Sequence, residues 1–236
     1  EMGLYENALE DYDKAIELYP DFAKAYMNRA YVRNMMGDYK ASKEDYDTAQ
    51  KKVQEYRAKN VTDAGSFADT TKKYSSLLSL DAEFAKKDFN DELLQHRDID
   101  IRLRPMYRFV LTGKKDDTSY ALDRGYDNPL VKRFIQQLPA GVEMLNADVR
   151  LDEGQMKKIE DAVYGQSASD ASGMFMRALV EYSEKQFNSS LNSYGMAIEE
   201  AQDESGLPRL YESFYRVNRG ALRAEMIEFI SSIESN

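Results

Sequence analysis

The first fifty residues carry a pattern of aromatic and small residues that repeats after 34 positions. In residues 3–15 an aromatic, a small, an aromatic and a small residue follow at intervals of three, four and three, and residues 37–49 repeat the series. Such intervals place side chains on one face of an α-helix. The pattern therefore predicts a helix over each stretch, with a ridge that packs against a neighbouring helix.

A further helix is predicted between these two stretches. Pro20 ends the first helix, because a proline disfavours the helical conformation of the residue before it. The run from Phe22 to Tyr31 is helical in character and has the small Ala30 where another helix crosses closely.

This arrangement resembles the tetratricopeptide repeat, a 34-residue pair of antiparallel helices. The residues that carry the resemblance are Ala8, Tyr12, Ala15, Pro20, Tyr26, Ala30, Gly37, Tyr39 and Ala49. Weaker copies of the same spacing begin at Phe67 and at Phe187. The resemblance implies a mainly α fold, an α-α solenoid of stacked helix pairs.

The last copy begins with the run 218–223, which matches residues 28–33. Phe229 follows Arg219 by ten residues, as Tyr39 follows Arg29, so this alignment predicts a turn before Phe229 and a short second helix over 228–236. The helix predicted over 4–19 is likewise a second helix, and its apolar face would be uncovered. We infer from these two ends that the chain is a piece of a longer repeat protein.

The middle of the chain has a different pattern. Residues 99–103 alternate between apolar and polar, which predicts a strand, and residues 107–111 can continue it. A short helix over 130–135, a strand over 142–145 and a helix capped by Asp152 complete this part. We therefore predict that a small α/β insert over 98–165 interrupts the solenoid and separates helical blocks at 1–97 and 166–236.

The middle also extends the resemblance. The runs 84–89, 103–106 and 175–179 are similar to those of large multi-repeat tetratricopeptide proteins of Bacteroides-type bacteria, in which an insert separates two repeat arrays. This similarity implies a periplasmic or cell-envelope location and a role in protein binding. The alternative function is structural, as a spacer or self-association segment of a larger repeat protein, and the third reading is an enzyme with its site in the insert.

Composition excludes several functions. The 236 residues have a net charge of -10, which disfavours a nucleic-acid partner, and no apolar run is long enough to span a membrane. The chain has no cysteine and one histidine, His96, which we interpret as an ordinary surface residue. No phosphate-binding loop, nucleophile elbow or Cys–His pair is present, so we expect neither catalysis nor a cofactor.

Tetratricopeptide arrays bind peptides or partner helices on the concave face formed by the first helix of each pair. The resemblance places on this face Lys24, Met27, Asn28, Tyr31, Asn34 and Met35, and later Phe175, Met176, Leu179, Tyr182, Val217, Asn218 and Ala221. An asparagine can donate to and accept from a peptide at once. The alternative is that these side chains contact a neighbouring helix or the insert. We expect Arg29 and Arg219 to form salt bridges between helices, with Asp11, Asp13 and Glu17 in range of Arg29.

Overall fold

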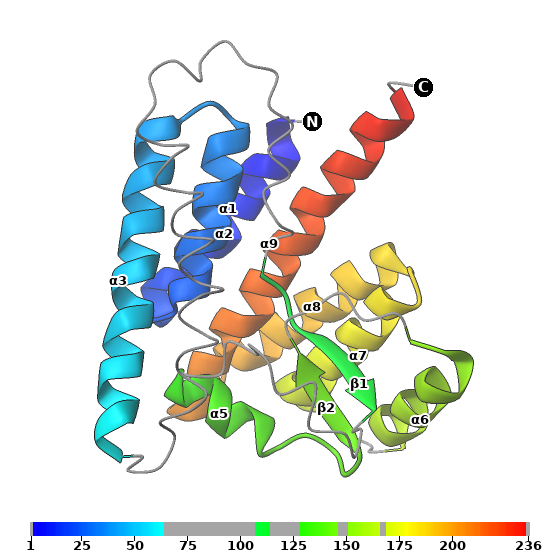
Figure 1. Ribbon diagram of the computed structural model, residues 1–236. Helices are drawn as coiled ribbons and strands as arrows, with labels where there is room; N and C mark the ends of the chain where they lie inside the picture. The colour runs from blue at the N-terminus through cyan, green and yellow to red at the C-terminus, as the bar shows by residue number, and fades with distance from the viewer. Residues whose placement is uncertain (1, 64–106, 114–127, 146–150, 166–168, 235–236) are drawn as a thin grey trace. The chain divides into compact units, whose positions relative to one another are not determined.

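The computed structural model of the chain describes residues 2–63, 107–113, 128–145, 151–165 and 169–234 (Figure 1). The chain divides into two compact units, residues 1–53 with 106–236, and residues 54–105. The first unit contains nearly all of the described residues. The repeat copy predicted from Phe67, the histidine at 96 and the strand predicted over 99–103 lie outside the described residues.

Helices dominate the described residues, as the sequence predicts. The first three are α1 (Met2–Leu18), α2 (Ala23–Met35) and α3 (Tyr39–Asp63), and the last three are α7 (Ala171–Ser183), α8 (Phe187–Gln202) and α9 (Leu207–Glu234). Gly37 lies between α2 and α3 with φ +83°, and Lys185 lies between α7 and α8 with φ 61°. A left-handed residue at this place ends the first helix of each pair and lets the chain reverse.

Two of the helix pairs share the same interhelical hydrogen bond. The Ser42 hydroxyl of α3 donates to the carbonyl of Ala30 in α2 at 2.7 Å. The Ser190 hydroxyl of α8 donates to the carbonyl of Ala178 in α7, also at 2.7 Å. A small residue on each helix lets the backbones approach closely enough for this bond. The equivalence confirms that α7 and α8 repeat the arrangement of α2 and α3.

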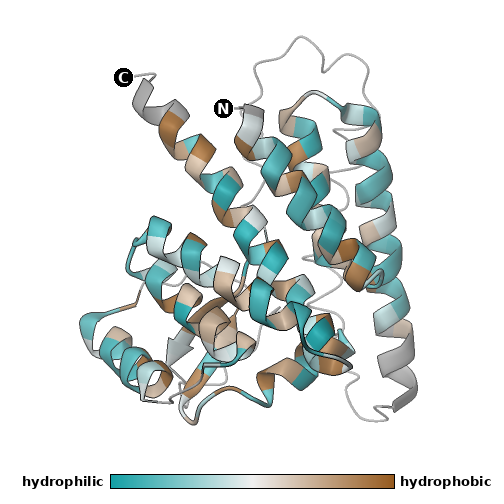
Figure 2. Cartoon of the chain, turned by 180° about the vertical axis from the view of Figure 1, so that it is seen from behind, coloured by the Kyte–Doolittle hydropathy of each residue, from teal (hydrophilic) through white to brown (hydrophobic). Residues whose placement is uncertain are grey.

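A third pair is formed by α9 and α1, although about 200 residues of sequence separate them. The two helices lie side by side in both views (Figures 1 and 2), and the side chains of Tyr12 and Tyr215 are fully buried. Gly220 occupies in α9 the position of Ala30 in α2, and a Cβ atom there would lie 2.6 Å from the ring of Tyr12. The apolar face of α1, which we expected to be uncovered, is therefore covered by α9.

The turn predicted before Phe229 is absent, so that prediction is wrong. Helix α9 runs without a break from Leu207 to Glu234. Alignment with the second repeat places Ile227 where Gly37 stands. A β-branched residue does not adopt the left-handed conformation that ends α2, so the helix continues.

Within the described residues, the insert has a strand, a helix, a strand and a helix in the predicted order, but the first strand begins at Val110, so residues 107–109 of the strand predicted over 107–111 are not in a strand. Strand β1 (Val110–Gly113) pairs antiparallel with β2 (Val142–Leu145), with Val110 opposite Leu145. Helix α5 (Pro129–Ile135) begins after Asn128, whose side chain accepts hydrogen bonds from two backbone N–H groups. Helix α6 (Glu153–Tyr164) begins at Asp152, which forms a capping box with Gln155.

One aromatic cluster joins the insert to the repeats. Phe109 beside β1 and Phe134 of α5 meet Phe214 of α9 edge to face, with ring centroids 5.6 and 5.7 Å apart. Phe134 makes a similar contact with Phe175 of α7 at 5.6 Å. Each of these four phenylalanines is at most 1% exposed. The insert is thus part of the repeat core, and this packing holds the segment before β1 against the first helices of the repeats.

Candidate peptide-binding surface

The side chain of Asn28 in α2 binds an extended segment of the chain itself. Its amide Nδ2 donates to the carbonyl of Tyr107 at 2.8 Å, and its Oδ1 accepts from the backbone N–H of Tyr107 at 2.8 Å. Asn28 is only 1% exposed. One side-chain amide therefore forms hydrogen bonds with both backbone groups of one residue, as expected for an asparagine that binds a peptide.

The equivalent asparagine of the neighbouring first helix binds the same segment two residues later. Oδ1 of Asn218 in α9 accepts from the backbone N–H of Phe109 at 2.7 Å, while its Nδ2 donates to the carbonyl of Phe214 at 2.9 Å. The third first helix, α7, has the buried Met176 at this position. Asparagines of two repeats thus bind alternate residues, Tyr107 and Phe109, of the segment before β1.

Arg108 lies between Tyr107 and Phe109 in the chain, and its side chain contacts α9 and α7. Its Nη1 donates to Glu225 of α9 at 2.5 Å, and its guanidinium lies 4.6 Å from the centroid of the Tyr182 ring in α7. The Tyr182 hydroxyl donates to the same carboxylate, at 2.7 Å to its nearer oxygen. A carboxylate and an aromatic face together form a site for a cation. Sequence reasoning found Tyr182 but missed Glu225 and Arg108.

Lys24 and Tyr31 also take part in intrachain contacts. The ammonium of Lys24 lies 5.3 Å from the ring centroid of Tyr107. The hydroxyl of Tyr31 donates to Glu228 of α9. Burial, and then the bond to this carboxylate, raise the pKa of Tyr31 above its ordinary value. The contact joins the C-terminal half of α2 to the C-terminal half of α9.

The predicted surface residues therefore divide into three groups. Asn28, Phe175, Met176, Leu179, Val217, Asn218 and Ala221 are buried; Lys24, Met27, Tyr31, Asn34 and Tyr182 are half-buried; and Met35 is exposed. The buried group is covered by the insert segment and by neighbouring helices, which is the alternative that the sequence left open. The accessible part of the face lies toward the C-terminal end of α2.

Exposed apolar side chains gather around this end. Met35, Met36 and Tyr39 are 47%, 42% and 63% exposed at the turn between α2 and α3. Phe229 and Ile230, next to the partner of Tyr31, are 59% and 37% exposed, and the same end of α9 contains hydrophobic residues in Figure 2. The sequence pattern alone singled out only Met35, because the repeat template assigns no role to the turn.

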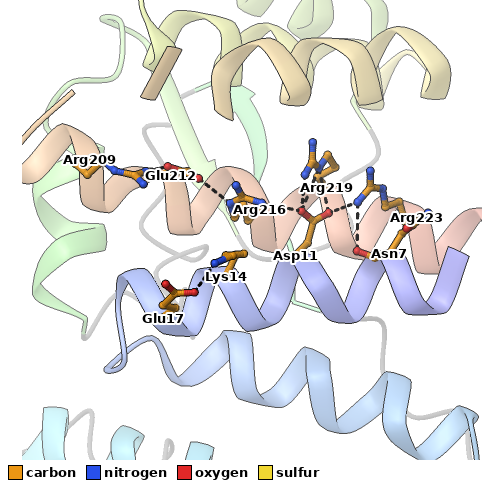
Figure 3. A network of polar contacts seen from close by, with 9 residues as sticks. All are labelled: Asn7, Asp11, Lys14, Glu17, Arg209, Glu212, Arg216, Arg219 and Arg223. Carbon is orange, nitrogen blue, oxygen red and sulfur yellow. Dashed lines mark hydrogen bonds and ion pairs between the residues drawn. The ribbon is translucent and has the colours of Figure 1, made fainter. Parts of the chain in front are cut away.

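The arginines behave as the sequence predicts. Arg29 binds Asp13 of α1 at 2.7 Å and Asp45 of α3 at 2.6 Å, so it joins helices. Arg219 binds Asp11 of α1 at 2.6 Å (Figure 3). Sequence reasoning named Asp11 as a possible partner of Arg29 and did not foresee its pairing with α9.

Two further properties concern only the residues that the structure describes. No group of three or more His, Asp or Glu side chains is arranged there to hold a metal ion. None of the helices in these ranges has the length and apolar character needed to cross a membrane.

The stacked helix pairs, with an asparagine at the equivalent position of two first helices, define a helical-repeat protein. A family model described as the tetratricopeptide repeat matches residues 1–37, which cover α1, α2 and the following turn. No curated protein and no solved structure matches the chain. The match supports a tetratricopeptide repeat protein, a class that typically mediates protein–protein interactions. The resemblance to Bacteroides-type proteins, and the location it implies, stay predictions.

Proposed function

We propose that the chain is a non-catalytic scaffold that binds a peptide or helix of another protein on the concave face of its repeats. The observation that carries the proposal is the pair of hydrogen bonds between the side chain of Asn28 and the backbone of Tyr107, one donated by Asn28 and one accepted by it. They mean that the chemistry of this face suits an extended polypeptide. Phe109 and Tyr107 are core residues, so their segment stays in place and the partner binds beside it.

The partner site in this proposal is the C-terminal end of α2. Tyr31, Asn34 and Met35 face the partner there, and the exposed Met36 and Tyr39 extend the surface. Exposed apolar side chains rimmed by polar ones are a feature of protein interaction sites, and methionine adapts its shape to different partners. The net charge of -10 favours a neutral or basic partner segment.

A phage-displayed library of random peptides, selected against the immobilised chain, tests this function. We expect the enriched peptides to bind the wild-type chain and to lose most of their affinity for the variant Met35→Glu. Met196→Glu is the matched control, because Met196 is 50% exposed on α8, outside the proposed surface. Both variants add one charge at an exposed methionine, so general surface effects cancel.

Two results would contradict the proposal. One is that no peptide is enriched over a library selected against the empty support. The other is that the enriched peptides bind Met35→Glu and the wild-type chain equally well. Either result would favour the alternative that we also derive from the repeats, a structural spacer or self-association segment of a larger protein.

A further inference from the structure

The α9–α1 pair reproduces the polar contacts of the α2–α3 pair. In α2–α3, Asp45 accepts from Arg29 at 2.6 Å and from Arg33 at 2.7 Å. In α9–α1, Asp11 accepts from Arg219 at 2.6 Å and from Arg223 at 2.6 Å. Asp11 and Asp45 are one repeat apart, and the two arginines are four residues apart in both first helices. The same residue types thus join both pairs at equivalent positions.

The contacts of Asp11 are more extensive than those of its counterpart. Its carboxylate is 1% exposed and has a third guanidinium, that of Arg216, at 3.5 Å (Figure 3). Arg216 also donates to Glu212 of its own helix at 2.7 Å, and Arg223 donates to the carbonyl of Asn7 at 3.2 Å. A buried carboxylate that lost these arginines would remain without compensation for its lost hydration. The contacts therefore specify which helix can lie on α9.

Shape adds to this specificity. The missing side chain of Gly220 makes room for the ring of Tyr12, which would otherwise lie 2.6 Å from a Cβ atom. Ala8 and Ala15 flank Tyr12 on the same face of α1 and are fully buried. The face that fits α9 therefore has the pattern Ala-x-x-Asp-Tyr-x-x-Ala.

The remaining first helix, α7, does not offer the same site. At the positions of Arg219 and Arg223 it has Arg177 and Glu181, and Glu181 accepts from Ser193 of α8 at 2.6 Å. An aspartate in place of Ser193 would meet the buried carboxylate of Glu181. Charge thus directs a helix such as α1 to α9 and away from α7.

The α2–α3 pair is joined by a short turn, whereas α9 and α1 are joined by no such turn and meet through side-chain contacts alone. We propose that α9 presents a docking site for a second helix of this pattern, which α1 fills within the chain and which α1 of a second copy can fill instead. Exchange between copies re-forms the contacts of α1 with α9, which is why identical elements exchange at low cost. Helix α1 contains five acidic side chains and one lysine, and the site on α9 contains Arg216, Arg219 and Arg223, so approach is also electrostatically favoured.

Complementation of two charge-reversed chains tests the exchange. Asp11→Arg and the double variant Arg219→Asp/Arg223→Asp each place like charges across their own α9–α1 contact. When they are mixed, the wild-type contact re-forms only between α9 of the first chain and α1 of the second. We expect light scattering after size exclusion to show a species of twice 27.1 kDa in the mixture and to show none with either variant alone. Asp13→Arg mixed with the double variant is the control, because Asp13 is exposed and its chain can still close on itself.

The proposal is overturned if the mixture forms no more dimer than the control mixture. A second measurement uses only the wild-type chain, so it does not depend on the folding of a variant. A labelled synthetic peptide of residues 2–19 is titrated with the wild-type chain beside a peptide that carries Asp11→Asn. We expect the substitution to weaken binding by at least about tenfold, because losing one partner of a buried charge pair raises the dissociation rate. Equal affinity of the two peptides, or no binding of either, would also overturn the proposal.

Discussion

The substitution Asn28→Asp tests whether the chain's own segment occupies the concave face. It replaces the amide by a carboxyl group of the same shape at a position that is 1% exposed. The oxygen that accepts from the N–H of Tyr107 at 2.8 Å is kept. The group that donates to the carbonyl of Tyr107 at 2.8 Å is replaced by a second oxygen, so this bond survives only if the carboxyl is protonated.

The expected loss of stability depends on the two ways in which the folded chain can respond. Leaving the Tyr107 carbonyl unpaired costs about 1–3 kcal/mol, before any repulsion from an ionised carboxylate. Keeping the carboxyl protonated at pH 7, against an ordinary pKa of about 3.9, costs roughly 4 kcal/mol at 1.36 kcal/mol per pH unit. The folded chain adopts whichever response costs less free energy, so Asn28→Asp should lower the free energy of unfolding by about 2–4 kcal/mol at pH 7.

The loss should also depend on pH with a definite sign. Burial raises the pKa of the introduced carboxyl in the folded state, so the folded chain binds more protons than the unfolded chain above pH 4. Stability relative to the wild type is therefore greatest at and below about pH 4 and falls as pH rises, by at most about 1.4 kcal/mol per unit, until the folded-state pKa is passed.

Urea unfolding followed by circular dichroism at pH 5.5 and pH 7.5 measures both effects. Asn34→Asp is the control, because Asn34 lies on the same helix but is only half-buried, at the accessible end of the concave face. It should change stability by less than about 1 kcal/mol. A loss below 1 kcal/mol for Asn28→Asp at both pH values, or a loss of equal size at both, would refute the proposed contact.

Three further predictions concern stability. Asp11→Asn should lower the free energy of unfolding in urea by about 3 kcal/mol, whereas Asp13→Asn, at an exposed pair, should cost less than about 1 kcal/mol; equal losses would contradict the buried network. Asp152→Ala removes the N-cap of α6 and should cost about 1 kcal/mol, and amide hydrogen exchange should be faster in the first turn of that helix, with no change if the cap is unimportant. Burial raises the pKa of Tyr194 and of Tyr215 above the ordinary value, so these hydroxyls stay protonated to a higher pH in the folded chain than in the unfolded chain. The free energy of unfolding should therefore fall as pH rises above about 10. Tyrosinate absorbance, which is clear in a chain without tryptophan, should show that part of the tyrosines ionise only when the chain unfolds.

The helices and their ends could be predicted because their causes are local. Intervals of three and four predict α1, α3 and α8 from a few neighbouring residues, and Asp152 predicts the start of α6. A local prediction that is wrong, the turn before Phe229, used the repeat alignment where the required glycine is missing. The alignment recorded the spacing of large and small residues and ignored the conformation that ends a helix.

The candidate surface could be predicted only in part for a related reason. The repeat pattern placed Asn28 and Asn218 at equivalent positions on one face of two first helices, since helical position follows from sequence spacing. It could not show that Tyr107 and Phe109 occupy that face, because no local pattern links residues about 80 and 110 positions apart. For the same reason Glu225, which holds Arg108, was missed.

The sequence by itself thus determined the pairs α2–α3 and α7–α8 and the order of strands and helices between them. Tertiary structure alone decided that α9 completes the pair of α1 and that the segment before β1 binds Asn28 and Asn218. Helix formation depends on neighbours within one or two turns, whereas the choice between distant partners depends on whether shape and charge match in space. Gly220 against Tyr12 and Asp11 against three arginines are such matches, and they become visible only when the two ends of the chain are side by side.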